Sequence, residues 1–498
     1  MRYQSTRGGA DSISPAETIA KGLSADGGLY VPYALPHLAA YTISALCKMS
    51  YSARAAYIIS LFLDDFDIPE LSGYAEAAYG PLSFSGASAA PLHQLDTGTH
   101  ILELWHGPTC AFKDMALQIM PRLLTASLKK TNENREACIL VATSGDTGKA
   151  ALEGFCGVSG TRIMVFYPKS GVSEIQKLQM VTQKGDNVSV IAVEGNFDDA
   201  QTGVKKLFSD ETLGAELSSS GFFLSSANSI NWGRLVPQIT YYVSAYCDLL
   251  NSGDIQAGEK INFCVPTGNF GNILAAWYAE RIGLPVNKLI CASNRNDVLT
   301  QFFSTGAYDR NRPFYTTISP SMDILVSSNL ERLLFEISGK DSGAVTGYMN
   351  ALSSVGRYEV SGVIKAELDR VFAGSCCSEE ETKKTIADVF SGFGYLIDTH
   401  TAVAYRALQK YRALTGDDTP SVVVSTASPF KFCESVLDAL GHSTAETGAN
   451  LISVLSDLTA TPVPEPLTAL GSEVPRFTES VPVQGMKDTV RSFLGTAN

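Results

Sequence analysis

The sequence is short of charged residues, and of basic residues most of all. Only 18% of its 498 residues are charged, below the value of about 25% that is usual in globular proteins. Lysine and arginine together number 38 against 51 acidic residues, which gives a net charge of −13. Nucleic-acid binding depends on clustered Lys and Arg, and no such cluster is evident. We therefore expect no nucleic-acid partner.

Membrane and metal signals are also missing. No apolar run reaches the roughly 18 residues typical of a membrane-spanning helix, and the first residues lack the apolar region of a secretion signal. The ten cysteines include the adjacent pair Cys376 and Cys377 but no CxxC motif, and the six histidines are scattered. These spacings do not suit a metal ion, so we expect no metal site. Reduced thiols fit the cytoplasm, where we place the protein, with no membrane partner.

What the chain does have is a large apolar fraction arranged in two successive patterns. Hydrophobic residues make up 45% of the sequence, and its length of 498 residues indicates about two or three domains. Residues 1–95 follow mostly helical spacing, as in SARAAYIISLFLDDF. From about residue 137, short β-rich runs alternate with glycine-bearing loops and helices, which predicts a parallel sheet flanked by helices. Ligands of such sheets bind at the loops that follow the strands.

One of these loops, in VPTGNFGNILAAW, has the features of an anion cradle. The residues between its strand and its helix are Gly268, Asn269, Phe270, Gly271 and Asn272. Glycine allows positive φ and close approach of the backbone to a ligand, and a helix N-terminus offers unpaired N–H groups to phosphate. The motif is neither a Walker loop nor a GxGxxG fingerprint. Taken alone, the loop is better explained as an ordinary glycine-rich turn between a strand and a helix.

Two further loops carry polar groups at the start of a predicted helix. In VATSGDTGKAAL, Thr143, Ser144 and Thr147 could hold a carboxylate, or Asp146 or Thr147 could simply cap the helix. In SSANSINWGR, Arg234 offers a planar fork that matches the oxygens of a phosphate. The alternative for this residue is an ordinary surface arginine.

Lys113 lies in HGPTCAFKD, after a Gly-Pro turn and a run of small and apolar residues. A lysine held in an apolar pocket has a lowered pKa, and its free amine is a nucleophile toward aldehydes. Such an amine beside a phosphate cradle, with no metal ligands, indicates pyridoxal phosphate. The alternative is that Lys113 pairs with Asp114 or with an exposed carboxylate on a solvated face.

Several motifs in sequence order resemble the threonine synthase family. HGPTCAFKD resembles the cofactor-lysine motif of that family, whose members are pyridoxal-phosphate enzymes of fold type II. The other matching motifs are STRG, KGLSADGGLYVP, SANSINWGR, PTGNFGN, SPSMDILVSSNLERLLFE, DTHTAVA and STASPFKF. The resemblance covers nearly the whole chain, from about residue 3 to 440, and is strongest to the longer subclass found in fungi and many bacteria.

The resemblance implies an α/β fold of type II, similar to the tryptophan synthase β subunit, with two parallel-sheet domains and an extra N-terminal domain. The implied domains are a mostly helical N-terminal domain (1–95), a large cofactor-binding domain (96–136 and 226–470, with an insertion at about 300–390) and a small mobile α/β domain (137–225).

The resemblance also assigns roles to individual residues. Lys113 is the Schiff-base lysine, and residues Gly268 to Asn272 cradle the cofactor phosphate. Thr426 places its hydroxyl near the pyridine nitrogen. The residues implied to surround the substrate carboxylate and the cofactor O3′ are Thr143, Ser144, Asp146 and Thr147. Those implied to hold the substrate phosphate are Asn228, Ser229 and Arg234.

The implied reaction converts O-phospho-L-homoserine and water into L-threonine and phosphate. We expect the protein to be a monomer or a homodimer. Ser428 and Phe430 stand where His and Ala are expected, and Thr399 stands where Pro is usual. The first two departures keep open a related phospholyase that releases 2-oxobutyrate. A serine or threonine dehydratase of the same fold is a further alternative, against which the phosphate site at Arg234 counts. A non-catalytic binding protein is another, against which the intact Lys113 and phosphate loop count.

Overall fold

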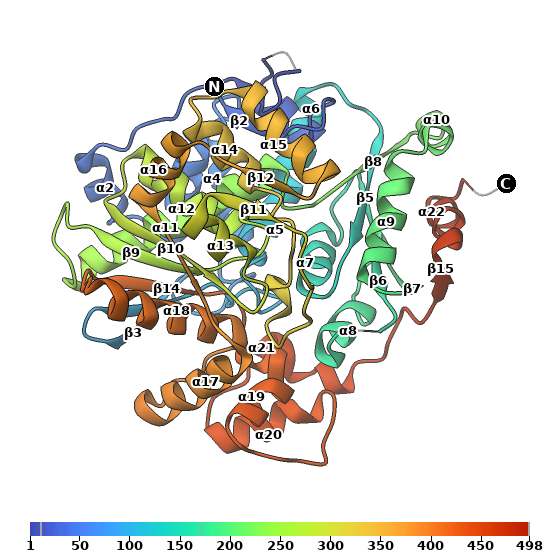
Figure 1. Ribbon diagram of the computed structural model, residues 1–498. Helices are drawn as coiled ribbons and strands as arrows, with labels where there is room; N and C mark the ends of the chain where they lie inside the picture. Colours follow the sequence, from blue (N-terminus) through green and yellow to red (C-terminus); the bar gives the residue numbers. More distant parts are fainter. Residues whose placement is uncertain (10–11, 171, 497–498) are drawn as a thin grey trace.

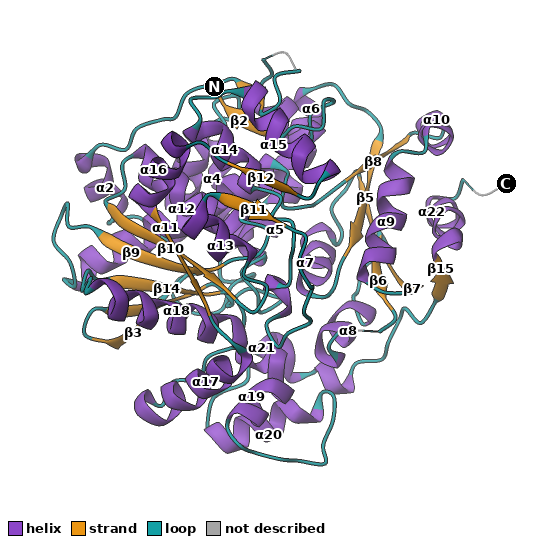
Figure 2. Ribbon diagram, viewed as in Figure 1, coloured by secondary structure: helices purple, strands orange, loops and turns teal. Residues whose placement is uncertain are grey.

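The computed structural model describes residues 1–9, 12–170 and 172–496. The described residues form two large sheets, which helices surround, and two small two-stranded sheets (Figures 1 and 2). The larger sheet has the strand order β13 (Phe372–Cys376), β10 (Val286–Ser293), β9 (Ile261–Pro266), β14 (Ser421–Ser425), β4 (Thr99–Glu103), β3 (Leu92–Asp96). The smaller has the order β15 (Ser480–Pro482), β7 (Val188–Glu194), β6 (Thr161–Pro168), β5 (Glu136–Ala142), β8 (Phe222–Ser225).

The strands of both large sheets are parallel, with one exception, and helices cover both faces of each of these sheets. Every residue of β9 and of β14 is buried, which is typical of a parallel sheet covered on both faces. The predicted α/β class with parallel sheets is thus confirmed. The exception is β3, which pairs antiparallel with β4 because a two-residue turn that ends in Gly98, at φ +93°, joins the two strands directly.

The helices of the larger part pack on its sheet and on the N-terminal segment. These helices are α5 (Asp114–Leu117), α6 (Met120–Lys130), α11 (Trp232–Ser252), α12 (Gly271–Ile282), α13 (Val298–Thr305), α14 (Leu330–Ile337), α15 (Ser342–Ser354), α16 (Gly362–Val371), α17 (Glu379–Phe393), α18 (Thr399–Thr415), α19 (Cys433–Ala439), α20 (Asn450–Thr459) and α21 (Glu465–Thr468). The short strands β11 (Ala307–Asp309) and β12 (Arg357–Glu359) pair beside α13. Within the stretch expected to be an insertion, β13 joins the larger sheet beside β10, so part of that stretch is integral to the sheet.

The smaller sheet carries α7 (Asp146–Phe155), α8 (Glu174–Val181), α9 (Phe197–Phe208) and α10 (Glu211–Ser219). The chain returns to this sheet at its end, where β15 pairs with β7 and α22 (Met486–Leu494) lies beside α9 (Figure 1). Met486 of α22 packs closely on α9, because a Cβ at Gly203 of α9 would lie 2.3 Å from the sulfur of Met486. The apolar face of α22 therefore completes the core on this side of the smaller sheet.

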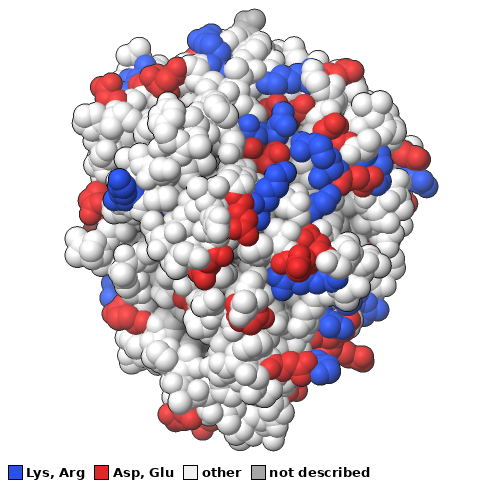
Figure 3. Space-filling view, turned by 90° about the vertical axis from the view of Figure 1, so that its left-hand side faces the viewer, with Lys and Arg blue, Asp and Glu red and all other residues white. Residues whose placement is uncertain are grey.

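Two features of the surface bear on function. None of the helices in the described part of the chain has both the length and the apolar character needed to cross a membrane. On the face drawn in Figure 3, basic and acidic side chains are interleaved.

The STRG motif joins the N-terminal segment to the larger part. This segment contains β1 (Tyr3–Ser5), α1 (Pro15–Lys21), β2 (Tyr30–Pro32), α2 (Ala40–Leu46), α3 (Tyr51–Ser60) and α4 (Ile68–Tyr79). Arg7 donates from Nε and Nη2 to the two oxygens of Glu331 at 3.0 and 2.9 Å. Thr6 donates its hydroxyl to the same carboxylate at 2.6 Å. Glu331 is only 5% exposed. A bidentate pair in this position fixes the segment against α14.

We predict that Glu331→Gln lowers the free energy of unfolding by about 1.5–3 kcal/mol, because a hydrogen-bonded, largely buried charge pair loses its anion. The midpoint of urea unfolding measures this change. Asp388→Asn is the control, since the Lys384–Asp388 pair is exposed and is worth no more than about 0.5 kcal/mol. Equal shifts of the midpoint in the two variants would contradict the prediction.

Candidate active site

Lys113 is placed by hydrogen bonds between the segment that precedes it and the segment that follows β14. Ala111 and Ala427 form an antiparallel bridge, and the N–H of Phe112 donates to the carbonyl of Thr426 at 2.8 Å. Because β14 is in the middle of the larger sheet, this pairing puts Lys113 at the carboxyl end of the parallel strands. Thr426, which is 6% exposed, therefore lies beside the lysine segment, and its role near the cofactor ring stays a prediction.

Asp114, although next in sequence, does not pair with Lys113. Its carboxylate accepts hydrogen bonds from the N–H and the hydroxyl of Thr109 at 2.9 and 2.7 Å. A Cβ at Gly107 would lie 2.6 Å from this carboxylate, so the glycine lets the turn pack on it. Burial raises the pKa of Asp114 to about 7. The alternative in which Lys113 is a surface lysine paired with Asp114 is thus wrong.

The amine of Lys113 is buried and loosely held. Its Nζ lies 3.5 Å from Oδ2 of Asp146 and 3.5 Å from Oγ of Ser321, and the side chain is 11% exposed. Burial lowers the pKa of Lys113, the charge of Asp146 opposes this effect, and the charges of Lys431 and Arg234 add to it. A lysine with a lowered pKa and long contacts is suited to act as a nucleophile or a base.

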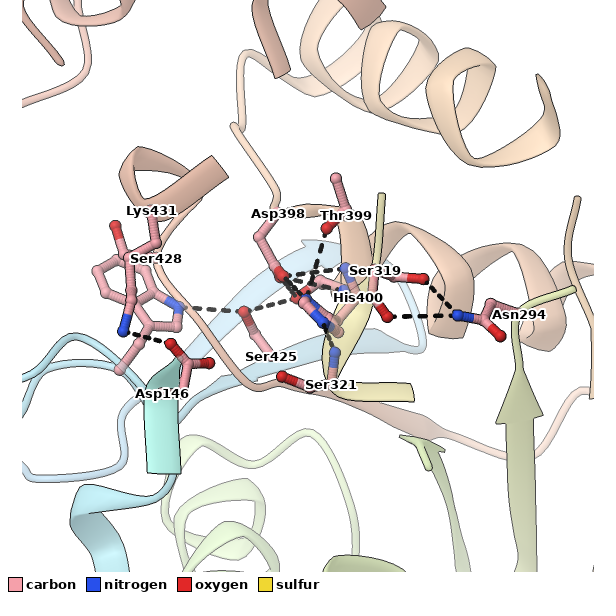
Figure 4. Close-up of polar contacts among 12 residues, drawn as sticks. Asp146, Asn294, Ser319, Ser321, Asp398, Thr399, His400, Ser425, Ser428 and Lys431 are labelled. Atoms are coloured by element: carbon pink, nitrogen blue, oxygen red, sulfur yellow. Dashed lines mark hydrogen bonds and ion pairs between the residues drawn. The ribbon is translucent and has the colours of Figure 1, made fainter. Parts of the chain in front are cut away.

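Asp146 is held by a second lysine that sequence reasoning did not assign to the site. Its Oδ1 lies 2.6 Å from Nζ of Lys431 (Figure 4) and accepts from the amide of Gln176 at 2.8 Å. Lys431 is fully buried and also donates to the carbonyl of Thr109 at 2.9 Å. Although burial raises the pKa of Asp146, the charges of Lys431 and Lys113 outweigh this and hold it well below its usual value. Asp146 is therefore an anion.

The glycine-rich loop after β9 leads into α12 as expected. Phe270, at φ +67°, is the N-cap residue, and the helix begins at Gly271. The side-chain oxygen of Asn272 accepts hydrogen bonds from the hydroxyls of Tyr241 and Tyr242 at 2.6 and 2.5 Å. Its Nδ2 is buried and has no partner among the described residues. A buried donor left unpaired is costly, so this amide, together with the N-terminal N–H groups of α12, fits an anion.

Ser321 brings this loop and Lys113 together. A Cβ at Gly268 would lie 2.4 Å from the carbonyl oxygen of Ser321, while the hydroxyl of the same serine lies 3.5 Å from Lys113 Nζ. Asn269, between the two glycines, accepts from the side chain of Asn329 at 3.0 Å. The lysine and the anion cradle therefore flank a single residue, as they must if one phosphorylated aldehyde is to reach both.

In the loop after β5 the structure corrects one expectation. Neither Asp146 nor Thr147 caps α7. Instead, the hydroxyl of Thr143 accepts from the N–H groups of Gly145 and Gly148 at 3.0 and 2.9 Å. Gly145 has φ +150°, which turns the chain so that Thr143 can reach the helix start. The hydroxyl of Thr143 is thus occupied within its own loop, and its contact with a substrate stays a prediction.

Arg234 is a buried guanidinium without a carboxylate partner among the described residues. It is 4% exposed and donates from Nη1 to the carbonyl of Ala227 at 2.8 Å, while its Nε has no partner in the part of the chain that the structure describes. Burial lowers its pKa to about 10. It is therefore not the surface arginine of the alternative. Asn228 in the same loop is exposed, and Ser229 accepts from the amide of Asn329 at 3.4 Å.

The remaining predicted residues lie at the edge of this arrangement. Ser144 is exposed and Thr147 is partly exposed, both at the start of α7 next to Asp146. Sequence reasoning assigned no role to Lys431 or Ser321, although both lie in the quoted motifs STASPFKF and SPSMDILVSSNLERLLFE. The motifs were the only available signal, because the partners of both residues are far away in sequence.

The site thus combines a reactive amine with two places suited to an anion. One is the start of α12 with Asn272 Nδ2, and the other is the guanidinium of Arg234; within the described residues, neither Asn272 Nδ2 nor Arg234 Nε has a partner. The amine and the first of these fit pyridoxal phosphate, with its aldehyde at Lys113 and its phosphate at residues 268–272. Within the described ranges, no group of three or more His, Cys, Asp or Glu is placed to hold a metal ion.

Comparisons with known proteins agree with this fit. Three family models match the chain: "Threonine synthase N terminus" at residues 2–79, "Pyridoxal-phosphate dependent enzyme" at 88–350 and "Threonine synthase, C-terminal" at 401–482. A threonine synthase of Pseudomonas aeruginosa is 41% identical over 88% of this chain and 90% of its own length. A crystal structure of PLP-bound threonine synthase from Brucella melitensis has a TM-score of 0.88 and 36% identity, covering 99% of both chains.

Threonine synthase-like 1 of Homo sapiens is also similar, with 40% identity over 90% of this chain. The chain spans only 61% of the length of that relative.

We predict that Gly268→Ala weakens binding of pyridoxal phosphate by about tenfold or more, because its Cβ would displace the carbonyl of Ser321 or the loop itself. Titration of the protein with cofactor, followed by absorbance, measures this affinity. Gly214→Ala in α10 is the matched control, since nothing lies within 4 Å of the added methyl group. Unchanged affinity in Gly268→Ala would show that the close approach is not needed.

We also predict that Asp146→Asn lowers the free energy of unfolding by about 3–5 kcal/mol, because it leaves the charge of Lys431 buried without its partner. The double variant Asp146→Asn/Lys431→Met should lose less than the sum of the two single variants, since the pair is coupled. Denaturant unfolding of all four proteins gives the coupling energy. Strictly additive losses would contradict a coupled pair.

Proposed function

Because this chain belongs to the threonine synthase family of pyridoxal-phosphate-dependent enzymes, we propose that it converts O-phospho-L-homoserine and water into L-threonine and phosphate. The enzyme is a lyase that uses pyridoxal phosphate as its cofactor. The observation that carries the proposed substrate is the buried guanidinium of Arg234, which has no carboxylate partner and an unpartnered Nε within the described part of the chain. The start of α12 serves the phosphate of the cofactor, so a second cationic site next to Lys113 calls for a second anion, which a phosphorylated substrate supplies.

Each group of the chain has a part in holding the reactants. Residues Gly268 to Asn272 hold the cofactor phosphate, and Thr426 lies toward its ring nitrogen. Arg234, with Asn228 and Ser229, holds the substrate phosphate before and after it leaves. The loop of Thr143, Ser144 and Thr147 binds the substrate carboxylate at the start of α7, where the helix dipole favours an anion.

Lys113 moves the protons. Pyridoxal phosphate, when bound, withdraws electrons from the substrate and so acidifies its Cα and then its Cβ protons. The amine of Lys113 accepts the proton from Cα, and the lowered pKa of this lysine keeps a basic fraction available near neutral pH. Asp146 accepts hydrogen bonds from the amine and stabilises its protonated form until the proton is returned.

We also propose that residues 137–225, on the smaller sheet, close over the larger part formed by residues 96–136 and 226–470. The contact between Lys113 and Asp146 crosses between these parts, since Asp146 begins α7 on the smaller sheet. The contact between Lys431 and Asp146, at 2.6 Å, crosses in the same way, so the site lies where the two parts meet and closure would cover it. Closure would also keep water out until phosphate has left. The cytoplasmic location and the monomeric or homodimeric state stay predictions.

The second candidate function is a phospholyase that eliminates phosphate and releases 2-oxobutyrate. The chain is about as similar to threonine synthase-like 1 as to threonine synthase, so family membership does not decide which product is released. Ser428 and Phe430, the departures from the family pattern, are buried next to Lys431. The hydroxyl of Ser428 accepts from the N–H of Phe430 at 3.4 Å, so Ser428 caps its own turn.

Product analysis separates these functions. We predict that the protein with bound cofactor releases threonine and phosphate in equal amounts from O-phospho-L-homoserine. We expect Lys113→Ala to be slower by roughly 10²–10⁴-fold, because the base is lost. Lys384→Ala, on an exposed helix face, is the control. Formation of 2-oxobutyrate would support the phospholyase, and no phosphate release at all would favour a non-catalytic binding protein.

A further inference from the structure

Ser321 contacts three different parts of the site. It lies in a short 3-10 helix, η1 (Pro320–Met322), in the connection between β11 and α14. Its hydroxyl is 3.5 Å from Nζ of Lys113, and its carbonyl is the atom on which Gly268 packs. Its backbone N–H donates to Nε2 of His400 at 3.2 Å. No other residue described so far contacts the amine and the phosphate loop at once.

His400 is a buried histidine whose protonation follows from its partners. Its Nδ1 lies 2.7 Å from Oδ2 of Asp398 (Figure 4), and both side chains are buried, at 1% and 0% exposure. Because Nε2 accepts the N–H of Ser321, the ring proton must be on Nδ1, where it donates to Asp398. The imidazole is therefore neutral and fixed in one orientation.

Asp398, which holds His400, is itself fixed in position. It is the N-cap residue of α18, and its carboxylate accepts the N–H groups of His400 and Thr401 at 2.9 and 3.0 Å. A carboxylate at the start of a 17-residue helix is stabilised by the helix dipole. A long helix packed on the larger sheet thus fixes the position of His400, and His400 in turn fixes that of Ser321.

The other side of η1 is fixed as well. Asp323 accepts hydrogen bonds from the side chains of Asn294, Asn296 and Thr317 at 2.7, 3.0 and 2.7 Å. Asn294 follows β10 and also donates to the hydroxyl of Ser319 at 2.9 Å (Figure 4). Hydrogen bonds to Ser319 and Asp323 therefore fix both ends of the short helix that carries Ser321.

The arrangement around Lys113 has a consequence for its lone pair. A neutral amine has two N–H bonds and one lone pair. Asp146 and Ser321 offer two acceptors at equal distance. When Asp146 and Ser321 each accept one N–H of the amine, the lone pair of the nitrogen must point away from both residues. A long lysine side chain is otherwise flexible, so two acceptors convert it into an oriented base.

From this geometry we propose that Ser321 is a catalytic residue that orients the amine of Lys113 through its hydroxyl, and that His400 and Asp398 are positioning residues that hold Ser321 by its N–H. The inference rests on the proposed function only in that Lys113 is the base. Ser321 makes and breaks no covalent bond, and the transferred proton stays on Lys113.

The test compares Ser321→Ala with Ser321→Thr, which keeps a hydroxyl. Phosphate release from O-phospho-L-homoserine gives kcat and KM, and an absorbance titration gives the affinity for pyridoxal phosphate. We expect kcat of Ser321→Ala to fall by about 10–100-fold, as for a misoriented catalytic group. We expect KM and cofactor affinity to stay within about threefold, and Ser321→Thr to recover most of the loss in kcat.

A second pair of variants tests the positioning residues and covers the case in which threonine does not fit. In His400→Gln the side-chain oxygen can still accept the N–H of Ser321, whereas in His400→Leu nothing can. We expect His400→Leu to lower kcat like Ser321→Ala, and His400→Gln to be the faster of the two. Thermal unfolding of each protein without cofactor shows whether the fold is kept.

The proposal is overturned if Ser321→Ala keeps the kcat of the unchanged protein, or if its cofactor affinity falls as far as its kcat, which indicates a structural role only. It does not depend on which product forms, because removal of the Cα proton precedes phosphate loss in both candidate functions. If the unchanged protein releases 2-oxobutyrate, the proposed synthase activity fails, while the ratio of phosphate release rates still decides the role of Ser321.

Discussion

The site depends on one carboxylate shared unequally by two lysines. Asp146 meets Lys431 at 2.6 Å and Lys113 at 3.5 Å. Lys431 is fully buried and neutralises most of the charge of Asp146, so Lys113 is attracted but not locked in place. With a short, exclusive ion pair to Asp146, Lys113 would be a permanent ammonium, and with no carboxylate nearby it could not hold a proton between steps. The intermediate condition suits a residue that must alternate between amine and ammonium.

Local chemistry predicts part of this site, and distance along the chain limits the rest. The amine at Lys113 and the anion cradle at Gly268 to Asn272 are contiguous motifs, so their chemistry can be predicted from the sequence. The pairing of Lys431 with Asp146, and of His400 with Ser321 across 79 residues, joins different loops of the sheet. A single sequence carries no signal for such contacts, and even the roles taken from family resemblance did not include them.

Local competition explains the smaller errors. Asp146 and Thr147 are both plausible capping residues, but the turn at Gly145, the N-cap residue, lets the hydroxyl of Thr143 accept the N–H of Gly148 instead. The alternating pattern of the larger sheet predicts parallel strands, but the short turn before β4 makes β3 antiparallel. In both cases the outcome is decided by backbone geometry at one glycine rather than by apolar periodicity.

The return of the chain to the smaller sheet has a mechanical consequence. In the described part of the chain, the backbone passes between the two sheets before β5, after β8 and again before β15. Two links that leave from neighbouring strands would let one half swing in almost any direction. The third link ends on the far edge strand, beyond β7, and would therefore restrict the directions in which the smaller part can rotate during the proposed closure. The last residues of the chain would thereby help to determine how the entrance to the catalytic lysine opens, although they lie far from it.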